Sequence, residues 1–248
     1  MIAATLGCTI TFTIPVGMGM LKSGDRLLFS RGMLIGTGTL PVTMIVGGLL
    51  SGLSFLQIVL QSLPVLLFCF LLMFGIWRFP EQTVRAFTVF ADVIRFLTTI
   101  GLIAGAFCYM TGFSLLPDLA PLEDAMAVVS SIGIVLLGSL PTAELLQRVL
   151  KKPLSFIGRK TGMNDSSAAG LLMGIVSPVP AITMMEKMDE RGKIVNAAFL
   201  VSAASTIAAH MGFTFGTDPD FVVPLLVAKL AGGIAAVCAA LFFTKKSA

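Results

Sequence analysis

Long apolar runs separated by short polar loops extend along almost the whole chain. Stretches with no charged residue, or with a single one, are found at Met1–Leu21, Gly32–Trp77, Phe96–Leu116, Ala125–Ala143, Ser166–Met185, Ile194–Thr217 and Phe221–Thr244. A helix crosses the hydrocarbon layer in about 20 residues, so Gly32–Trp77 has room for two spans folded at Gly48–Ser54. Because the runs are continuous rather than alternating with period two, they predict eight helical membrane segments.

The composition agrees with this pattern and excludes several classes of protein. The 248 residues are 56% hydrophobic and 12% charged, whereas about 25% of the residues of soluble domains are charged. A single soluble core could not cover so much apolar surface. We therefore expect an all-α fold, a polytopic transmembrane helix bundle in which residues 1–248 form one transporter domain. A soluble enzyme, a disordered tail and a secreted disulfide scaffold are excluded.

Lysine and arginine residues are concentrated in alternate loops of this pattern. Three lie in the Lys22–Arg31 loop, none in the turn near Ser51, three in Arg78–Arg95, none in Pro117–Asp124 and five in Glu144–Asp165. Loops rich in these residues remain in the cytoplasm. The alternation therefore predicts a multi-pass membrane protein whose basic loops are cytoplasmic.

The segment Ser166–Met185 breaks this alternation if it crosses the membrane, because the basic loop after it would then lie outside. A re-entrant hairpin over residues 166–185 instead keeps every Lys and Arg except Lys229 in the cytoplasm, and the C-terminus with them. Pro178 and Pro180 lie in mid-segment, where each removes a backbone donor and disfavours helix in the residue before it. We predict seven crossings plus one re-entrant hairpin, with a proline-kinked full span as the alternative.

Polar side chains inside apolar segments are the candidate substrate contacts, because each costs free energy at membrane depth unless it is satisfied. One group surrounds the proline break, and a second lies on the helix that follows. On that helix Ser202, Thr206 and His210 follow one another at intervals of four, and Asn196 joins them only from the inner end. Broken helices expose backbone donors and acceptors to a substrate. The predicted substrate-binding residues are Ser177, Asn196, Ser202, Ser205 and His210, with a packed kink and a structural histidine as alternatives.

Other chemistry has little support in the sequence. No P-loop, GxGxxG, HExxH, GxSxG or CxxC motif is present, His210 is the only histidine, and the cysteines lie apart in apolar runs. We therefore predict no catalysis, metal or cofactor, and no nucleic-acid partner. Lys229 lies about eight residues into the last span, where a charge is costly, and its role is left open. GxxxG spacings such as Gly32/Gly36 and Gly170/Gly174 permit close helix packing.

Several stretches resemble the EutH family of ethanolamine permeases. Near the start these are Gly7-Cys8-Thr9-Ile10-Thr11-Phe12-Thr13-Ile14-Pro15-Val16, and later Ile134-Val135-Leu136-Leu137-Gly138-Ser139-Leu140-Pro141 and Lys152-Pro153-Leu154. The most specific stretch is Met184-Met185-Glu186-Lys187-Met188-Asp189-Glu190-Arg191-Gly192-Lys193-Ile194-Val195-Asn196, which continues through Phe199, Val201-Ser202-Ala203-Ala204 and His210-Met211-Gly212-Phe213. The resemblance covers nearly the whole chain.

This resemblance implies uptake of ethanolamine across the inner membrane of a bacterium, in ethanolamine utilization. It also implies that the chain is the C-terminal part of a longer permease, because family members extend further at the N-terminus. Two positions depart from the family: Ala209 replaces an acid before the histidine, and Ser177-Pro178 replaces an asparagine pair. The alternatives are a permease for another small amine or polyol, and a non-transporting membrane fragment that binds partners. A homo-oligomer is left open.

Overall fold

The computed structural model describes residues 3–113 and 151–244, together with isolated positions between them (Met126, Ser130, Leu137, Pro141, Leu145, Arg148 and Val149). The described residues form helices joined by short turns, which confirms the all-α prediction. In chain order the elements are η1 (Ala3–Gly7), η2 (Thr9–Thr13), α1 (Ile14–Met20), α2 (Ser23–Gly38), α3 (Leu40–Leu50), α4 (Phe55–Arg78), α5 (Pro80–Thr111), α7 (Lys151–Thr161), α8 (Asp165–Val176), α9 (Pro178–Met184), η3 (Met185–Lys187), α10 (Glu190–Ala203), η4 (Thr206–His210), α11 (Met211–Thr217), η5 (Pro219–Phe221) and α12 (Val222–Phe243).

Five helical stretches in the described part of the chain are long and apolar enough to cross a membrane. They are Ser23–Leu50, Phe55–Leu72, Glu81–Thr111, Glu190–Thr214 and Pro219–Phe243, and Ala4–Met20 and Asp165–Val176 form shorter apolar helices. The finding confirms a polytopic helical membrane protein. The count of seven crossings plus one hairpin stays a prediction, because most of the segment Ala125–Ala143 lies outside the described residues.

The turn between the first two long stretches lies where the sequence predicts it. After α3 the chain reverses at residues 51–54, where Gly52 adopts a φ of +78° that only glycine adopts readily. Ser54 then caps α4, with its hydroxyl accepting from the Gln57 N–H and the Gln57 side chain accepting from the Ser54 N–H. This reciprocal pair starts the next helix immediately after the turn.

Helix α10 forms the centre of the body, between α2 on one side and α12 on the other. From Ile194 to Ala203 every residue of α10 is buried. Gly32 and Gly36 on α2 lie directly against its backbone, because a Cβ on either glycine would collide with the carbonyl oxygen of Ile194 or Ala198. This GxxxG pair therefore sets the close approach of α2 to α10.

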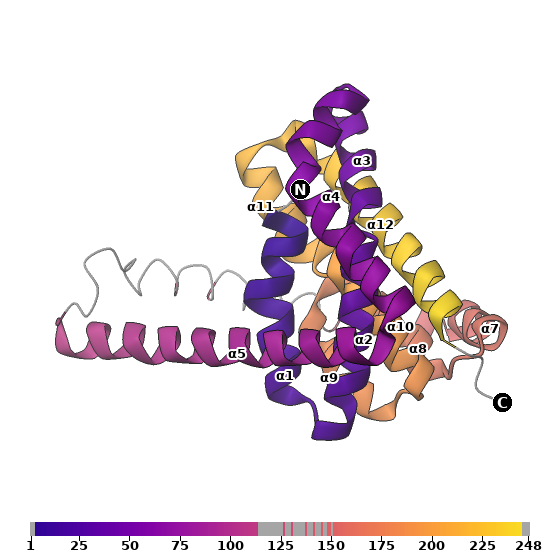
Figure 1. The fold of residues 1–248 in the computed structure, drawn as a ribbon, viewed down its shortest axis with the longest axis horizontal. Helices are drawn as coiled ribbons and strands as arrows, with labels where there is room; N and C mark the ends of the chain where they lie inside the picture. Colours follow the sequence, from indigo (N-terminus) through magenta and orange to yellow (C-terminus); the bar gives the residue numbers. More distant parts are fainter. Residues whose placement is uncertain are drawn as a thin grey trace.

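Helix α5 is oriented differently from the rest of the body. Its first half packs on α1 and α2 and buries Val84, Phe87 and Ala91. Its second half extends sideways away from the body (Figure 1), and Ile100, Ile103 and other large apolar side chains there are exposed. The predicted span Phe96–Leu116 begins in the middle of this single helix rather than at its start.

Charged side chains tie several helix ends together at one end of the body. The contacts join Lys22 to Glu186 (2.9 Å), Lys193 to Asp25 (2.6 Å), Arg31 to the Phe243 carbonyl (2.9 Å) and Arg191 to the Leu241 carbonyl (3.2 Å). The N-terminal ends of α2 and α10 therefore meet the C-terminal end of α12. Basic residues from two separate loops share one end, as the positive-inside prediction requires. Which side of the membrane this end faces stays a prediction.

The contact between α2 and α10 yields a direct stability prediction. Gly36→Ala places a methyl group against the Ala198 carbonyl, so we expect the variant to lose about 1–3 kcal/mol of unfolding free energy through overpacking. Thermal unfolding in detergent measures the loss. Gly101→Ala on the exposed half of α5 is the control, because nothing lies within 4 Å of its added Cβ. Equal melting temperatures for the two variants would contradict the assigned contact.

Candidate functional site

The segment predicted to be a hairpin enters and leaves the body at the same end. The backbone N–H of Asn164, just before α8, donates to the Asp189 carboxylate over 2.9 Å. The Asn164 side-chain amide donates to the Lys187 carbonyl, also over 2.9 Å. Between these ends the chain breaks at Ser177, which is extended (φ −156°, ψ 140°) because Pro178 follows it. Helices α8 and α9 therefore form two arms that meet at Ser177.

Asp189 holds the base of these two arms together. Its carboxylate accepts hydrogen bonds from the N–H of Asn164, the hydroxyl of Ser167 and the N–H of Gly192, at the start of α10. Burial disfavours the charged form of Asp189, but these hydrogen bonds outweigh burial and lower the pKa of its carboxyl below the ordinary 3.8. The carboxylate is thus both the cap of α10 and the link between α8 and α10.

A second break interrupts the long stretch that starts with α10. The α-helix ends at Ala203, and Ser205 adopts a left-handed conformation (φ 55°), the only positive φ at a non-glycine residue among the described residues. The Ser205 N–H, released from its own helix, donates to the carbonyl of Gly174 near the end of α8 over 3.1 Å. The two breaks therefore lie next to each other, with Ser177 one helical turn from Gly174.

His210 closes the turn that follows this second break. Its backbone N–H donates to the Ser205 carbonyl over 3.1 Å, and Nδ1 lies 3.1 Å from the Ala204 carbonyl. A carbonyl oxygen can only accept, so Nδ1 carries the proton of this hydrogen bond. In the neutral ring Nε2 is then an acceptor. These two hydrogen bonds, to the carbonyl groups of Ser205 and Ala204, hold the half-buried imidazole beside the break.

Two helix C-terminal ends converge at this place. Helix α8 ends at Val176 and α10 ends at Ala203, and the hydrogen bond from Ser205 to Gly174 brings these ends together. The last carbonyl groups of a helix lack partners within the helix and carry the negative end of its dipole. Converging C-terminal ends favour a cation, even though no aspartate or glutamate is buried in the described part of the chain.

The structure brings three of the five predicted site residues together and places the other two apart. Ser177, Ser205 and His210 surround the paired breaks. Ser202, one turn earlier on α10, accepts a hydrogen bond of 3.1 Å from the Thr43 hydroxyl of α3. Asn196 lies nearer the start of α10 and donates to the carbonyls of Ser167 (2.8 Å) and Gly192 (2.9 Å). The hydrogen bonds of Ser202 and Asn196 therefore join α10 to α3 and to α8, away from the two breaks.

Sequence reasoning missed the buried polar groups of the first segment. Thr5, Thr9 and Thr13 are buried at intervals of four residues, and the Thr9 hydroxyl donates to the Val201 carbonyl of α10 over 3.3 Å. Lys229 of α12, whose role the sequence left open, donates to the Ala4 carbonyl over 3.0 Å. The four-residue spacing of threonines within an apolar run was the available signal, because it places the three hydroxyls on one helix face.

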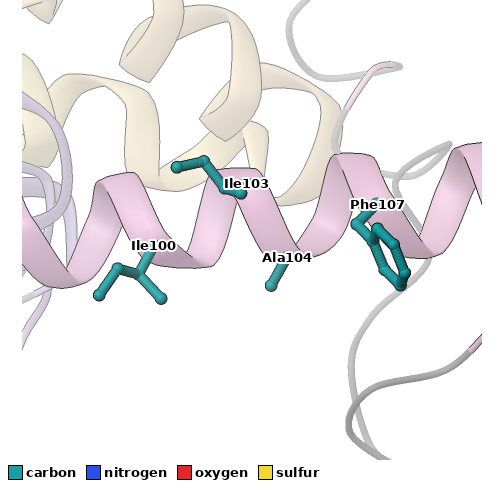
Figure 2. Close-up of a pocket in the computed structure, with 4 residues that line it drawn as sticks. All are labelled: Ile100, Ile103, Ala104 and Phe107. Atoms are coloured by element: carbon teal, nitrogen blue, oxygen red, sulfur yellow. The ribbon is translucent and has the colours of Figure 1, made fainter.

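An apolar groove on α5 lies apart from this site. Figure 2 shows its lining, which consists of Ile100, Ile103, Ala104 and Phe107 on one face of the exposed half of the helix. All of these side chains are hydrocarbon, so they offer a polar solute no hydrogen bond. The groove therefore has the chemistry of a lipid-facing surface.

The chain is similar to one protein family along nearly its whole length. Residues 1–243 match the family model described as "Ethanolamine utilisation protein, EutH". The chain is similar to the "Probable ethanolamine permease EutH" of Listeria monocytogenes, with 37% identity over 245 residues covering 99% of this chain and 66% of that protein. It is 33% identical to the protein of the same name in Escherichia coli over 268 residues, with the same coverage. It is 32% identical to the "Uncharacterized protein YxeR" of Bacillus subtilis over 239 residues, covering 96% and 65%.

The chain thus spans just under two thirds of the length of the relatives that it matches. No solved structure matches it.

The base of the hairpin generates a prediction about stability and pH. The lowered pKa of Asp189 means that its carboxylate stabilises the folded state fully above about pH 4, and that this stabilisation is lost as the pH falls through the folded-state pKa. Asp189→Ala removes the cap and is expected to cost about 0.5–2 kcal/mol at pH 7. Melting temperatures measured from pH 7 to pH 3 should converge for the variant and the unsubstituted protein at the acid end.

The matched control for this series is Glu190→Ala, on the neighbouring exposed residue of the same helix end. It should shift the melting temperature much less than Asp189→Ala at pH 7. A constant gap between Asp189→Ala and the unsubstituted protein across the whole pH range would contradict the role assigned to the carboxylate.

Proposed function

Because this chain belongs to the EutH family, we propose that, within the full-length protein, it forms the part of a permease that binds ethanolamine and carries it across the bacterial inner membrane. The observation that supports this proposal is the convergence of two broken helices at Ser177 and Ser205. Breaks of this kind expose backbone groups to a solute, and membrane proteins tolerate them only where protein or a cavity surrounds them.

The substrate's ammonium group would bind the negative ends of α8 and α10. At neutral pH ethanolamine is largely a cation, and a cation in a low-dielectric interior needs either an opposing charge or several oriented dipoles. The carbonyl groups at the two helix ends supply such dipoles, as carbonyl groups do in cation-selective filters. An acid beside His210 is then unnecessary, which accounts for Ala209 at that position.

The substrate's hydroxyl group would bind the side chains that surround the breaks. Ser177 and Ser205 offer hydroxyl groups that both donate and accept, and Nε2 of neutral His210 accepts. Ser202 and Asn196 would act on binding indirectly, because their hydrogen bonds fix α10 against α3 and α8. The proposed contacts are therefore Ser177, Ser205 and His210, with Ser202 and Asn196 as positioning residues.

The hairpin geometry supports a cytoplasmic entry and exit of the segment 165–188. A hydrogen bond joins Asn164 to Asp189, so the two ends of the hairpin lie next to each other. If Ser177 lies within the membrane, both ends must therefore lie on the same face of it. The ion pair of 2.6 Å between Lys193 and Asp25 belongs to the same end. We propose that this end is cytoplasmic, since its loops carry the basic residues.

Uptake of radiolabelled ethanolamine by the full-length protein tests the site. Ser205→Gly removes a hydroxyl while keeping the left-handed backbone, and His210→Phe removes the acceptor. Each variant is expected to lower uptake about two- to tenfold, because a hydrogen bond between neutral groups contributes about 0.5–1.5 kcal/mol. Thr98→Ala removes an exposed hydroxyl on α5 as the control. Unchanged uptake in both site variants, with the protein present in the membrane, would remove the assignment.

Competition by other amines tests the chemistry of the ammonium contact. Carbonyl oxygens recognise an ammonium group through its N–H donors, whereas quaternary ammonium groups require aromatic faces. An excess of unlabelled ethanolamine should therefore abolish uptake of the labelled substrate, and the same excess of choline should leave most of it. Equal competition by the two compounds would favour the alternative of a permease for another amine.

A further inference from the structure

Lys229 is a charged residue in the interior of the body. Its side chain is fully buried (0% exposed), and it is the only buried residue among the described ones that carries a formal charge. The contact that the structure gives to its ammonium group is a hydrogen bond of 3.0 Å to the carbonyl of Ala4. A carbonyl group is neutral, so it satisfies one donor without cancelling the charge.

Among the residues that the structure describes, none supplies Lys229 with a compensating carboxylate. The segments of α3 and α10 packed against α12 carry no Asp or Glu at its level, and the Cys8 thiol and the His210 imidazole are titratable groups that interact electrostatically with it. Asp218 and Asp220 lie at the exposed start of α12, about two turns away or more. Arg31, another cation, bonds the Phe243 carbonyl at the far end of this helix.

Lys229 is also close to the proposed substrate site. Gly232, one turn along α12, packs so tightly on α10 that a Cβ there would lie 2.9 Å from the Ser202 hydroxyl oxygen. Ser202 lies one turn before the break at Ser205, and α12 also contacts η4, which ends at His210. The lysine and the paired breaks therefore share one low-dielectric interior.

Two positive charges in such an interior repel each other strongly, because little water screens them. Binding of ethanolammonium at the breaks would bring a second cation next to Lys229. The repulsion disappears if the lysine loses a proton. The neutral amine still has two N–H donors, so it can keep its hydrogen bond to the Ala4 carbonyl.

We propose that Lys229 releases one proton when ethanolammonium binds, and takes one up when the substrate leaves. In this step an N–H bond of the ammonium group breaks, its electron pair stays on Nζ, and the proton passes to water through the open site. The interior then holds one positive charge in both the empty and the loaded state. Substrate entering from outside releases a proton to the outside, and its exit to the cytoplasm takes one from there. Uptake is thus an electroneutral exchange of ethanolammonium for a proton, an inference that rests on the proposed function.

Proton release on binding is the direct test. The purified full-length protein, in weakly buffered solution with a pH-sensitive dye, is titrated with ethanolamine near pH 7 while binding is followed by calorimetry. The unsubstituted protein should release about one proton for each ethanolammonium bound, and Lys229→Met should bind ethanolamine and release none. Lys160→Met, on an exposed lysine, is the matched control and should behave like the unsubstituted protein.

A second measurement needs no variant, in case Lys229→Met does not fold. In proteoliposomes containing the unsubstituted protein, the initial rate of ethanolamine uptake should be unaffected by an imposed membrane potential and raised by an acidic interior. Binding without proton release, or uptake that follows the potential, would overturn the role of Lys229 and leave the proposed function intact. Absence of ethanolamine binding by the unsubstituted protein would instead overturn the proposed function.

Discussion

Two helices of this protein stop inside an apolar body, and each break leaves backbone groups that the helix itself cannot bond. An unsatisfied N–H or C=O group away from water costs free energy comparable to a lost hydrogen bond, and the cost is larger in lipid. The hydrogen bond from the Ser205 N–H to the Gly174 carbonyl pairs one such group of one break with one of the other. It holds the C-terminal ends of α8 and α10 side by side, and the position of Ser177 and His210 depends on it.

Small residues make this close approach possible. Asn196 of α10 faces Gly170 so closely that a Cβ on the glycine would lie 2.5 Å from the Asn196 side-chain oxygen, and Gly174 packs on Leu200 one turn further along. The spacing Gly170/Gly174 thus gives α8 a flat face against α10. Gly232 does the same for α12, where Ser202 and Thr43 meet. Glycines thus allow the helices of the body to pack closely. The polar groups of the candidate site lie where this packing brings helix ends together.

The sequence allowed the helical architecture to be predicted because the apolar runs are long and the turn residues are explicit. The reversal after α3 follows from the polar and glycine-containing stretch at Gly48–Ser54, and the break at Ser177 follows from Pro178. The break at Ser205 has no such signal, since neither proline nor glycine lies next to it and a serine adopts the left-handed conformation there. That conformation is stabilised by tertiary contacts, which a single sequence does not display.

In the candidate site, too, some features could be predicted from the sequence and others depend on tertiary contacts. Helical periodicity places Asn196 and Ser202 on different faces of α10, but only the neighbouring helices decide what each face meets. Asn196 meets the backbone of α8, and Ser202 meets Thr43 of α3, a residue 159 positions away in the sequence. The sideways direction of the exposed half of α5 likewise depends on how its first half packs on α1 and α2.

The proposed site requires that the polypeptide enters the membrane before Ser177 and returns to the same face after it. Single cysteines at positions 164 and 193, in a full-length protein lacking other cysteines, report the face of each end through labelling with a membrane-impermeant maleimide. We expect both positions to be protected in intact cells and to react in inside-out vesicles. Reaction of one position from outside and the other from inside would contradict this expectation.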